Sequence, residues 1–237
     1  MNLVSTPLSK LELSQKQTSF LITANHAFEM SVYQSHLIQD SLKDSEKARY
    51  NENQFIHLQF QPKKDYAEIA LQIRMRQIQY LYHFTDKQNI NSIIKYGGLY
   101  SWSALVEKKI DSKMGGNELS HKLDCRFNLQ DYVRLSSNFE TPMQYRLKER
   151  GYKLVKLLIH PIVALLNDTL FSNMNATDNR VVIGDTSNHI SGILAAAPCG
   201  ILARDDRRFA VSQSEILVKH FIPLQYIINI YDVEQTI

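Results

Sequence analysis

The sequence of 237 residues has only two cysteines, Cys125 and Cys199, and neither has a second Cys or a His at the spacing of a zinc site. Neither a disulfide framework nor a bound metal is indicated, and both side chains are expected to be free thiols. The amino-terminal segment lacks the pattern of a secretory signal, and no apolar run approaches the roughly 20 residues of a membrane-spanning helix. These absences predict a cytoplasmic protein with no membrane partner.

Three widespread functional motifs are also missing. The chain has no glycine-rich phosphate loop, no His-Glu-x-x-His zinc helix and no Gly-x-Ser-x-Gly turn around a nucleophilic serine. The usual nucleotide-binding, metalloprotease and serine-hydrolase sites are therefore not indicated. If the protein binds a nucleotide, something other than a glycine-rich loop must hold it.

What the chain does contain is typical of a globular protein: 44% of its residues are hydrophobic and 22% are charged. The net charge of +3 is compatible with a nucleic-acid partner but does not require one. Basic clusters lie either on solvated faces or against nucleic acid, and here they occupy one part of the chain, with Lys108, Lys109, Lys113, Lys122, Arg126, Arg134, Arg146, Lys148, Arg150, Lys153 and Lys156.

Residues 1–76 are predicted to form a mostly helical extension. Apolar residues recur at three- and four-residue steps from Leu21 to Leu42, which indicates an amphipathic helix. Alternation over residues 56–60 suggests a short strand that Pro62 ends, and helical spacing resumes from Tyr66 to Ile73. Because no glycine-rich linker follows, the extension is expected to pack on the main domain, residues 77–237.

The main domain is predicted to be α+β. A helix over Lys87–Tyr96 begins after Asp86, a suitable N-cap, and ends at Gly97-Gly98. Many short strands with few intervening helices favour an α+β arrangement over a doubly wound sheet. The predicted strands cover residues 78–84, 132–136, 153–159, 180–183, 216–218 and 226–231.

Candidate site residues occur at three places. His83 and Thr85 share one side of the first strand, just before the helix, although a lone His is more often structural. Arg126 lies between apolar neighbours and suits either a phosphate or a structural ion pair. Gln213 and Glu215 share a strand face, where they can reach one ligand or form an ion pair at the strand edge.

Taken together and in this order, these segments resemble the DarT-type family of NAD-dependent nucleic-acid ADP-ribosyltransferases. The resemblance covers residues 78–232 and consists of several short motifs, none of which is sufficient alone. These are Tyr82-His83-Phe84-Thr85, Asn89-Ile90-Asn91-Ser92-Ile93-Ile94, Gly98-Leu99, Asp131-Tyr132-Val133, Pro142-Met143, the segment from Leu170 to Ala176, and Gln213-Ser214-Glu215 before Pro223.

The resemblance implies an ADP-ribosyltransferase-like fold, with a central split β-sheet, flanking helices and a cleft for NAD. Glu215 would be the catalytic carboxylate, because cleavage of the nicotinamide–ribose bond develops positive charge at the sugar. Arg126 would contribute to catalysis and meet the NAD pyrophosphate, with Lys122 or Arg134 as alternatives. The residues that would hold the rest of NAD are His83, Thr85 and Asn91.

The resemblance also implies an acceptor. Residues 101–128 would fold over NAD, and the loop from Asp185 to Ser212 would recognise single-stranded DNA, with RNA as the alternative. The residues expected to contact nucleic acid are Gln213, Arg204, Arg207 and Arg208. A protein of this kind would act as a toxin restrained by an antitoxin, and the rival interpretation is an inactive relative that only binds NAD or nucleic acid.

Overall fold

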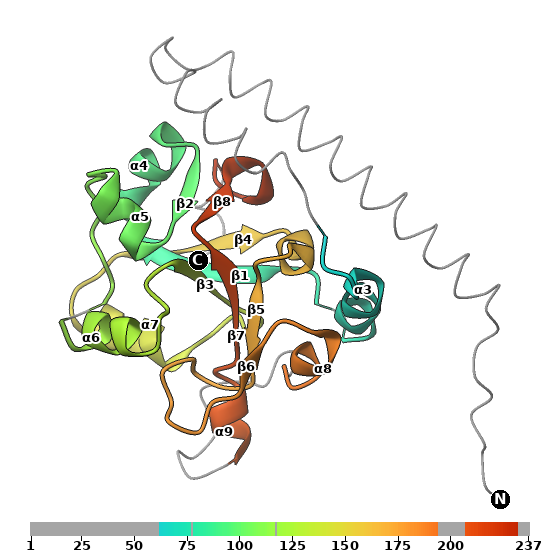
Figure 1. Ribbon diagram of the computed structural model, residues 1–237. Coiled ribbons are helices and arrows are strands. Elements are labelled where there is room, and N and C mark those ends of the chain that lie inside the picture. Colours follow the sequence, from blue (N-terminus) through green and yellow to red (C-terminus); the bar gives the residue numbers. More distant parts are fainter. Residues whose placement is uncertain (1–61, 77, 117, 194–206, 232–237) are drawn as a thin grey trace, which may run out of the picture.

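A computed structural model describes residues 62–76, 78–116, 118–193 and 207–231. The helix expected over residues 21–42, the strand expected over residues 56–60, Cys199 and Arg204 lie outside these ranges. Figure 1 shows a central β-sheet, with helices α4 to α7 gathered on one side of the molecule and α3 and α8 on the other. Among the described helices, none is long and apolar enough to cross a membrane.

The central sheet has six strands, and every neighbouring pair is antiparallel. In spatial order they are β4 (Leu154–Ile159), β1 (Leu81–Asp86), β3 (Tyr132–Ser136), β7 (Glu215–Lys219), β5 (Leu170–Ser172) and β6 (Ile183–Gly184). A separate two-stranded sheet pairs β2 (Gly98–Tyr100) with β8 (Phe221–Pro223). Strands in one antiparallel sheet with helices between them confirm the α+β prediction.

The six-stranded sheet is split between β1 and β3. Along β1 all six residues pair with β4, whereas its register with β3 consists of the single pair Tyr82–Ser136. β3 is in turn paired with β7 along all five of its residues. The sheet therefore consists of two well-paired halves that separate from one another beyond Tyr82.

Side chains alternate between the two faces of the sheet. One face carries Leu81, Leu157, Val133 and Ile216, all at most 3% exposed, and these residues belong to the main hydrophobic cluster. The opposite face carries polar and ionisable side chains at matching register positions, including Ser136 of β3 opposite Glu215 of β7.

Helices and turns connect the strands. Within the described residues, the α-helices are α3 (Tyr66–Met75), α4 (Ile90–Lys95), α5 (Trp102–Glu107), α6 (Glu118–Arg126), α7 (Pro142–Glu149), α8 (Ser187–Ile190) and α9 (Arg207–Val211). The same residues contain the 3-10 turns η1 (Lys87–Asn89), η2 (Pro161–Leu165) and η3 (Leu224–Tyr226). α3 buries Ile69 and Ala70 in the same cluster as β1, so the helix predicted from Tyr66 packs directly on the main domain.

The helix predicted after the first strand is confirmed, together with both of its boundaries. The Asp86 carboxylate accepts a hydrogen bond from the Gln88 amide and caps η1, which leads into α4. Gly97 follows α4 with a φ of 80°. At Gly98, a Cβ atom would lie 2.1 Å from the Ile222 carbonyl oxygen, so only glycine permits the close pairing of β2 with β8.

Two predicted strands differ from the structure. Of residues 180–183 only Ile183 belongs to a strand, and Gly184 completes that strand. Residues 226–231 form the end of η3, a single antiparallel β-bridge from Ile227 to Ile159, and a turn, although Tyr226, Ile227 and Ile230 are buried. The apolar residues between positions 226 and 231 are buried, but burial alone does not specify an extended backbone.

Candidate active site

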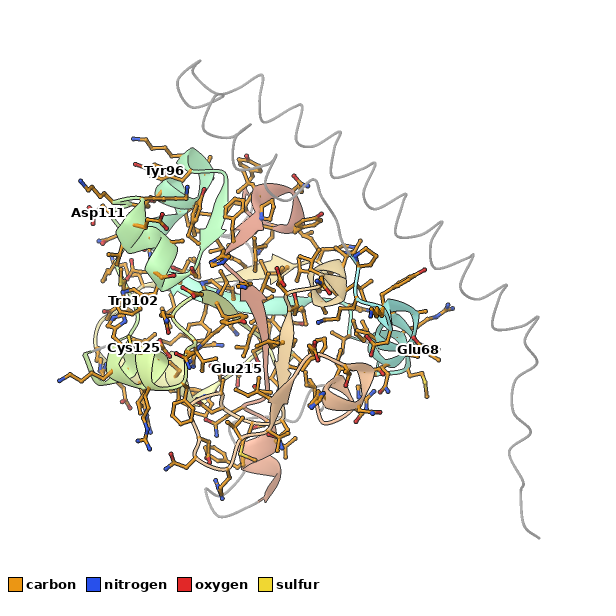
Figure 2. All side chains as sticks on the ribbon, viewed as in Figure 1. Glu68, Tyr96, Trp102, Asp111, Cys125 and Glu215 are labelled. Atoms are coloured by element: carbon orange, nitrogen blue, oxygen red, sulfur yellow. The ribbon has the colours of Figure 1, made fainter. Side chains whose placement is uncertain are left out.

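A cleft of about 350 Å³ opens where β1 and β3 separate. Its walls come from both halves of the sheet, from α4, α5 and α6, from residues 110–116 (the 110–116 loop) and from the start of α7. Glu215 lines the cleft from the first position of β7 and lies near the centre of the molecule in Figure 2. Tyr96, Asp111, Trp102 and Cys125 mark the side of the molecule built by α4 to α6 (Figure 2).

Glu215 is held by two donors on one oxygen. Its Oε2 accepts a hydrogen bond from the Ala176 amide at 2.9 Å and lies 3.5 Å from an Arg134 guanidinium nitrogen. The side chain is 17% exposed, so the carboxylate is largely removed from water. This burial raises the pKa of Glu215, an effect that Arg134 and the Ala176 amide oppose without cancelling. The carboxylate is thus fixed in position and binds a proton more readily than an exposed glutamate.

Arg134 lies between two carboxylates of the cleft. One guanidinium nitrogen donates to Asp124 of α6 and the other approaches Glu215. Burial raises the pKa of Asp124, and the Arg134 charge counteracts it. The Asp124 carboxylate in turn adds to the raised pKa of Glu215. Because one cation serves two acids, Glu215 is oriented by Arg134 without losing its negative character.

His83 joins the two halves of the sheet at the base of the cleft. Its Nδ1 lies 3.1 Å from the Arg134 carbonyl oxygen, which can only accept, so Nδ1 carries the proton. Burial lowers the pKa of His83, although the hydrogen bond to this carbonyl works in the opposite direction. The ring is therefore neutral near pH 7, and Nε2 is an acceptor.

Thr85 and the 110–116 loop are held by one amide side chain. Asn89, buried at 6% exposure, donates to Thr85 Oγ1 and to the Lys113 carbonyl oxygen, both at 2.9 Å. Its own Oδ1 accepts from the Lys113 amide at 2.8 Å. These three hydrogen bonds fix the loop against β1 and η1 at the rim of the cleft.

An ion pair strengthens this attachment. Lys113 Nζ lies 2.6 Å from Asp86 Oδ2 and 4.4 Å from the centroid of the Tyr152 ring. Burial alone would raise the pKa of Asp86, but hydrogen bonds from Lys113 and two backbone amides lower it. Tyr152 in addition donates its hydroxyl hydrogen to the Met114 carbonyl oxygen at 3.0 Å. Residues 112–116 thus border the cleft, and the prediction that residues 101–128 fold over NAD remains a prediction.

Gln213 and Ser214 directly precede Glu215 and line the end of the cleft beside it, and Thr141 also lines the cleft. The Gln213 side-chain amide donates to the Phe209 carbonyl oxygen at 3.2 Å. Within the described residues, Ser214 Oγ and Thr141 Oγ1 are buried and make no hydrogen bond. Buried hydroxyl groups normally find a partner, so this end is suited to a ligand with polar edges.

Two of the predicted site residues do not line the cleft. Arg126 is exposed on α6 with its guanidinium 5.6 Å from the Phe127 ring centroid, whereas Arg134, one of the alternatives, faces Glu215. Asn91 is exposed on α4, whereas Asn89 lines the cleft.

The other predicted residues are distributed as follows. His83, Thr85, Gln213 and Glu215 line the cleft together. Arg207 and Arg208 begin α9, the helix that precedes Gln213, and their side chains lie outside the described part of the structure. Asp124 was missed because a carboxylate next to a basic cluster is indistinguishable by sequence from a surface acid. In the part of the chain that is described, no group of three or more His, Cys, Asp or Glu side chains is placed to hold a metal.

Comparison with known proteins gives a family match. The family model described as "DarT: ssDNA thymidine ADP-ribosyltransferase, DarT" matches residues 82–236. No curated protein matches.

Two solved structures have a similar fold. Thermosipho africanus DarTG in complex with ADP-ribose superimposes with a TM-score of 0.55 and 21% identity, over 63% of this chain and 42% of that one. Thermus sp. 2.9 DarT in complex with ADP-ribosylated ssDNA superimposes with a TM-score of 0.52 and 16% identity, over 64% of this chain and 79% of that one. This chain therefore spans less than half of the Thermosipho chain. Together with the split sheet, these matches confirm the ADP-ribosyltransferase-like fold.

Proposed function

The chain belongs to the DarT family of ssDNA thymidine ADP-ribosyltransferases, and we propose that it transfers ADP-ribose from NAD to a thymine base in single-stranded DNA. NAD is the co-substrate and nicotinamide is released. The observation that carries the proposal is the Glu215 carboxylate, held by Ala176 and Arg134 inside the cleft between the two halves of the sheet.

The reaction follows from the chemistry of the two substrates. The bond between the ribose anomeric carbon and the nicotinamide nitrogen breaks, and its electron pair leaves with nicotinamide. The sugar develops oxocarbenium character, which a fixed carboxylate such as Glu215 stabilises. In a thymidine nucleotide, one ring nitrogen is bonded to the deoxyribose and the other carries a hydrogen. The second nitrogen must lose its proton as it forms the new bond to the anomeric carbon.

Glu215 suits both parts of this reaction. As an anion it stabilises the positive sugar, and its raised pKa makes it a better acceptor for the thymine proton. Arg134 takes the place first given to Arg126, because it orients Glu215 while Asp124 prevents full neutralisation. Gln213, with the unpartnered hydroxyl groups of Thr141 and Ser214, meets the polar edge of the acceptor base.

His83, Thr85 and Asn89 hold the NAD side of the cleft. His83 Nε2 accepts a hydrogen bond from a hydroxyl or amide group of NAD, and the Thr85 hydroxyl, whose oxygen already accepts from Asn89, is left to donate its own hydrogen. Asn89 replaces Asn91 in this role because it lines the cleft and fixes the 110–116 loop.

The test uses NAD labelled in its adenosine half and single-stranded oligonucleotides that differ by one thymine. We expect label on the thymine-containing DNA and none on its thymine-free counterpart, on RNA or on protein. Label on RNA alone would move the activity to the second candidate acceptor, and label on neither nucleic acid would support the inactive-relative interpretation.

We further infer that the enzyme acts in the cytoplasm as a toxin whose activity an antitoxin restrains, because covalent modification of thymine blocks base pairing. Induction of the wild-type chain is expected to arrest growth, whereas the Glu215→Gln variant is expected to be tolerated. Equal growth of both strains would contradict the toxin role.

We also infer that residues 77–237 form the transferase domain and that residues 1–76 are an extension. The family match begins at residue 82, in support of this division. A chain that begins at residue 62 keeps α3, which contributes to the main core, and is expected to retain DNA labelling. Loss of labelling in a folded chain of this length would assign the extension a part in the reaction.

A further inference from the structure

We propose that a surface leading from the cleft along α7 binds the single-stranded DNA that flanks the acceptor base. This α7 track consists of Phe139, Met143, Arg146 and Arg150. It rests on the proposed function, since it extends the same acceptor site. The basic side chains of this region stand out in the sequence, and the NAD cleft does not account for them.

Phe139 is an exposed aromatic ring held in one place. It is 45% exposed, on the loop between β3 and α7. Lys156 Nζ lies 3.1 Å from its ring centroid, and the Tyr82 ring meets it edge-on with centroids 5.5 Å apart. Gln144 Nε2 donates to the Phe139 carbonyl oxygen at 3.2 Å and fixes the loop backbone. A rigid, half-exposed ring with a cation beside it is the arrangement on which nucleic-acid bases stack.

The remaining residues of the track form one stripe along α7. Met143 and Arg146 lie in α7, and Arg150 follows the helix directly as its C-cap residue. Because the three residues are three and four positions apart, their side chains project from the same side of the helix. Met143 lines the cleft and is 37% exposed, and both arginines are exposed. From Met143 to Arg150 the stripe covers roughly 10 Å at the rise of an α-helix. Guanidinium groups on such a stripe suit successive phosphates of a strand that leaves the cleft.

The track begins at the acceptor end of the cleft. Tyr82 and Met143 line the cleft itself, and Ser136 of β3, three residues before Phe139, is paired with Glu215. Asn138 Nδ2 donates to the Ser212 carbonyl oxygen, next to Gln213. A base held beside Glu215 therefore has the Phe139 loop as its immediate neighbour.

Charge on this side of the molecule favours a polyanion. Around the stripe, Lys148 and Lys153 are also exposed, and the acidic side chains that face solvent are Glu140 and Glu149. Glu140 accepts a hydrogen bond from the Tyr145 hydroxyl at 2.7 Å. Four exposed cations against two acids give this surface a net charge of +2. Stacking surface combined with cations matches single-stranded nucleic acid better than a purely apolar partner.

The first measurement is binding of a fluorescent oligonucleotide, without NAD, as a function of salt. The double variant Arg146→Ala/Arg150→Ala should reduce the slope of log affinity against log salt by about 1.4, because each phosphate contact on a single strand contributes about 0.7. The matched control is Arg74→Ala/Lys64→Ala, which removes two exposed cations on the side of α3, across the molecule from α7 (Figure 1). The control should keep the wild-type slope, and equal slopes for both double variants would overturn the proposal.

The second measurement concerns Phe139. Phe139→Ala should weaken oligonucleotide binding about tenfold, whereas Phe139→Trp should restore it, because stacking on one aromatic side chain contributes about 1–3 kcal/mol per base. Thermal unfolding of both variants should match the wild type, because the ring is half exposed. Binding that is unchanged in Phe139→Ala would overturn the stacking role.

The third measurement separates the track from the catalytic proposal. Oligonucleotides with the thymine at one end and an extension on its 5′ or its 3′ side are compared as acceptors. The α7 double variant should raise KM for one of the two extensions and leave the other at the wild-type value. DNA labelling without any such difference would keep the transferase and reject the track. Loss of binding in the α7 variant without labelling by the wild type would keep the track and reject the transferase. If the α7 double variant weakens the binding of RNA but not of DNA, the α7 track is rejected as a DNA-binding surface.

Discussion

Replacing Glu215 with Gln changes one charge and little else. Glutamine has the same length and keeps an oxygen that accepts from the Ala176 amide, which lies 2.9 Å from Oε2 in the wild type. Arg134 keeps its contact with Asp124. The variant therefore tests the negative charge of Glu215 and not the architecture around it.

The expected loss of activity is large. A preorganised electrostatic partner of the transition state is worth about 10²–10³ in rate, or about 3–4 kcal/mol.

The stability of the Glu215→Gln variant should increase, although its activity falls. Burial raises the pKa of Glu215, so the folded protein disfavours the ionised carboxylate. Above this raised pKa the wild type bears that cost and the Gln variant does not, so at pH 7 the variant should have the higher free energy of unfolding.

The difference in stability between the Glu215→Gln variant and the wild type should depend on pH. Stability associated with a raised carboxyl pKa is present below the ordinary value of 4.5 and is lost as the pH rises through the folded-state pKa. The gap in Tm between variant and wild type should therefore be largest near neutral pH and close below 4.5. Labelling assays at pH 7 and thermal unfolding from pH 4 to 8 provide both readouts. Wild-type activity in the variant, or lost activity with a lower Tm at pH 7, would refute the catalytic role.

Other substitutions probe the neighbours of Glu215, the 110–116 loop and the core. Asp124→Asn removes a charge that raises the pKa of Glu215, so the acidic limb of kcat/KM should move to lower pH, and Arg134→Leu should move it to higher pH; limbs that stay in place would contradict the coupling. Asn89→Ala removes three hydrogen bonds and should raise KM for NAD about tenfold with little change in kcat; a fall in kcat alone would contradict a role in holding NAD. Phe171→Ala, at a fully buried position of β5, should lower the free energy of unfolding in urea by about 3–5 kcal/mol; a loss below 1 kcal/mol would show that the core does not depend on this ring.

Local patterns predicted the elements that have a strong internal period. The strand over residues 132–136 and the helix from Tyr66 are confirmed because alternation and three- to four-residue spacing are properties of a single segment. The split between β1 and β3 has no such signature. It depends on where two strands whose first residues are 51 positions apart, Leu81 and Tyr132, stop pairing, which is decided by the packing of the whole sheet.

Two predicted site residues do not line the cleft, and helix geometry gives the reason. Arg126 and Asn91 are exposed, whereas Asp124 and Asn89, each two residues earlier in the chain, line the cleft. Both pairs are two residues apart in helical segments, where such a step turns the side chain by about 200°. In a strand the same step returns to the same face, and His83 and Thr85 do line the cleft together. Residues two apart in a motif therefore share one face when they lie on a strand, and point to different sides when they lie on a helix.

The structural role of His83 is compatible with the role in NAD binding that we propose for it. Beyond Tyr82 the backbone of β1 no longer pairs with β3, and the Arg134 carbonyl on that side needs another donor. His83 Nδ1–H supplies it at 3.1 Å, which satisfies the edge of β3 and fixes the ring at the base of the cleft. The same bond sets the tautomer and so makes Nε2 an acceptor. The sequence posed a choice between a buried structural histidine and a ligand-binding one, but the bond that secures the divided sheet also leaves Nε2 able to accept the hydrogen bond proposed for NAD.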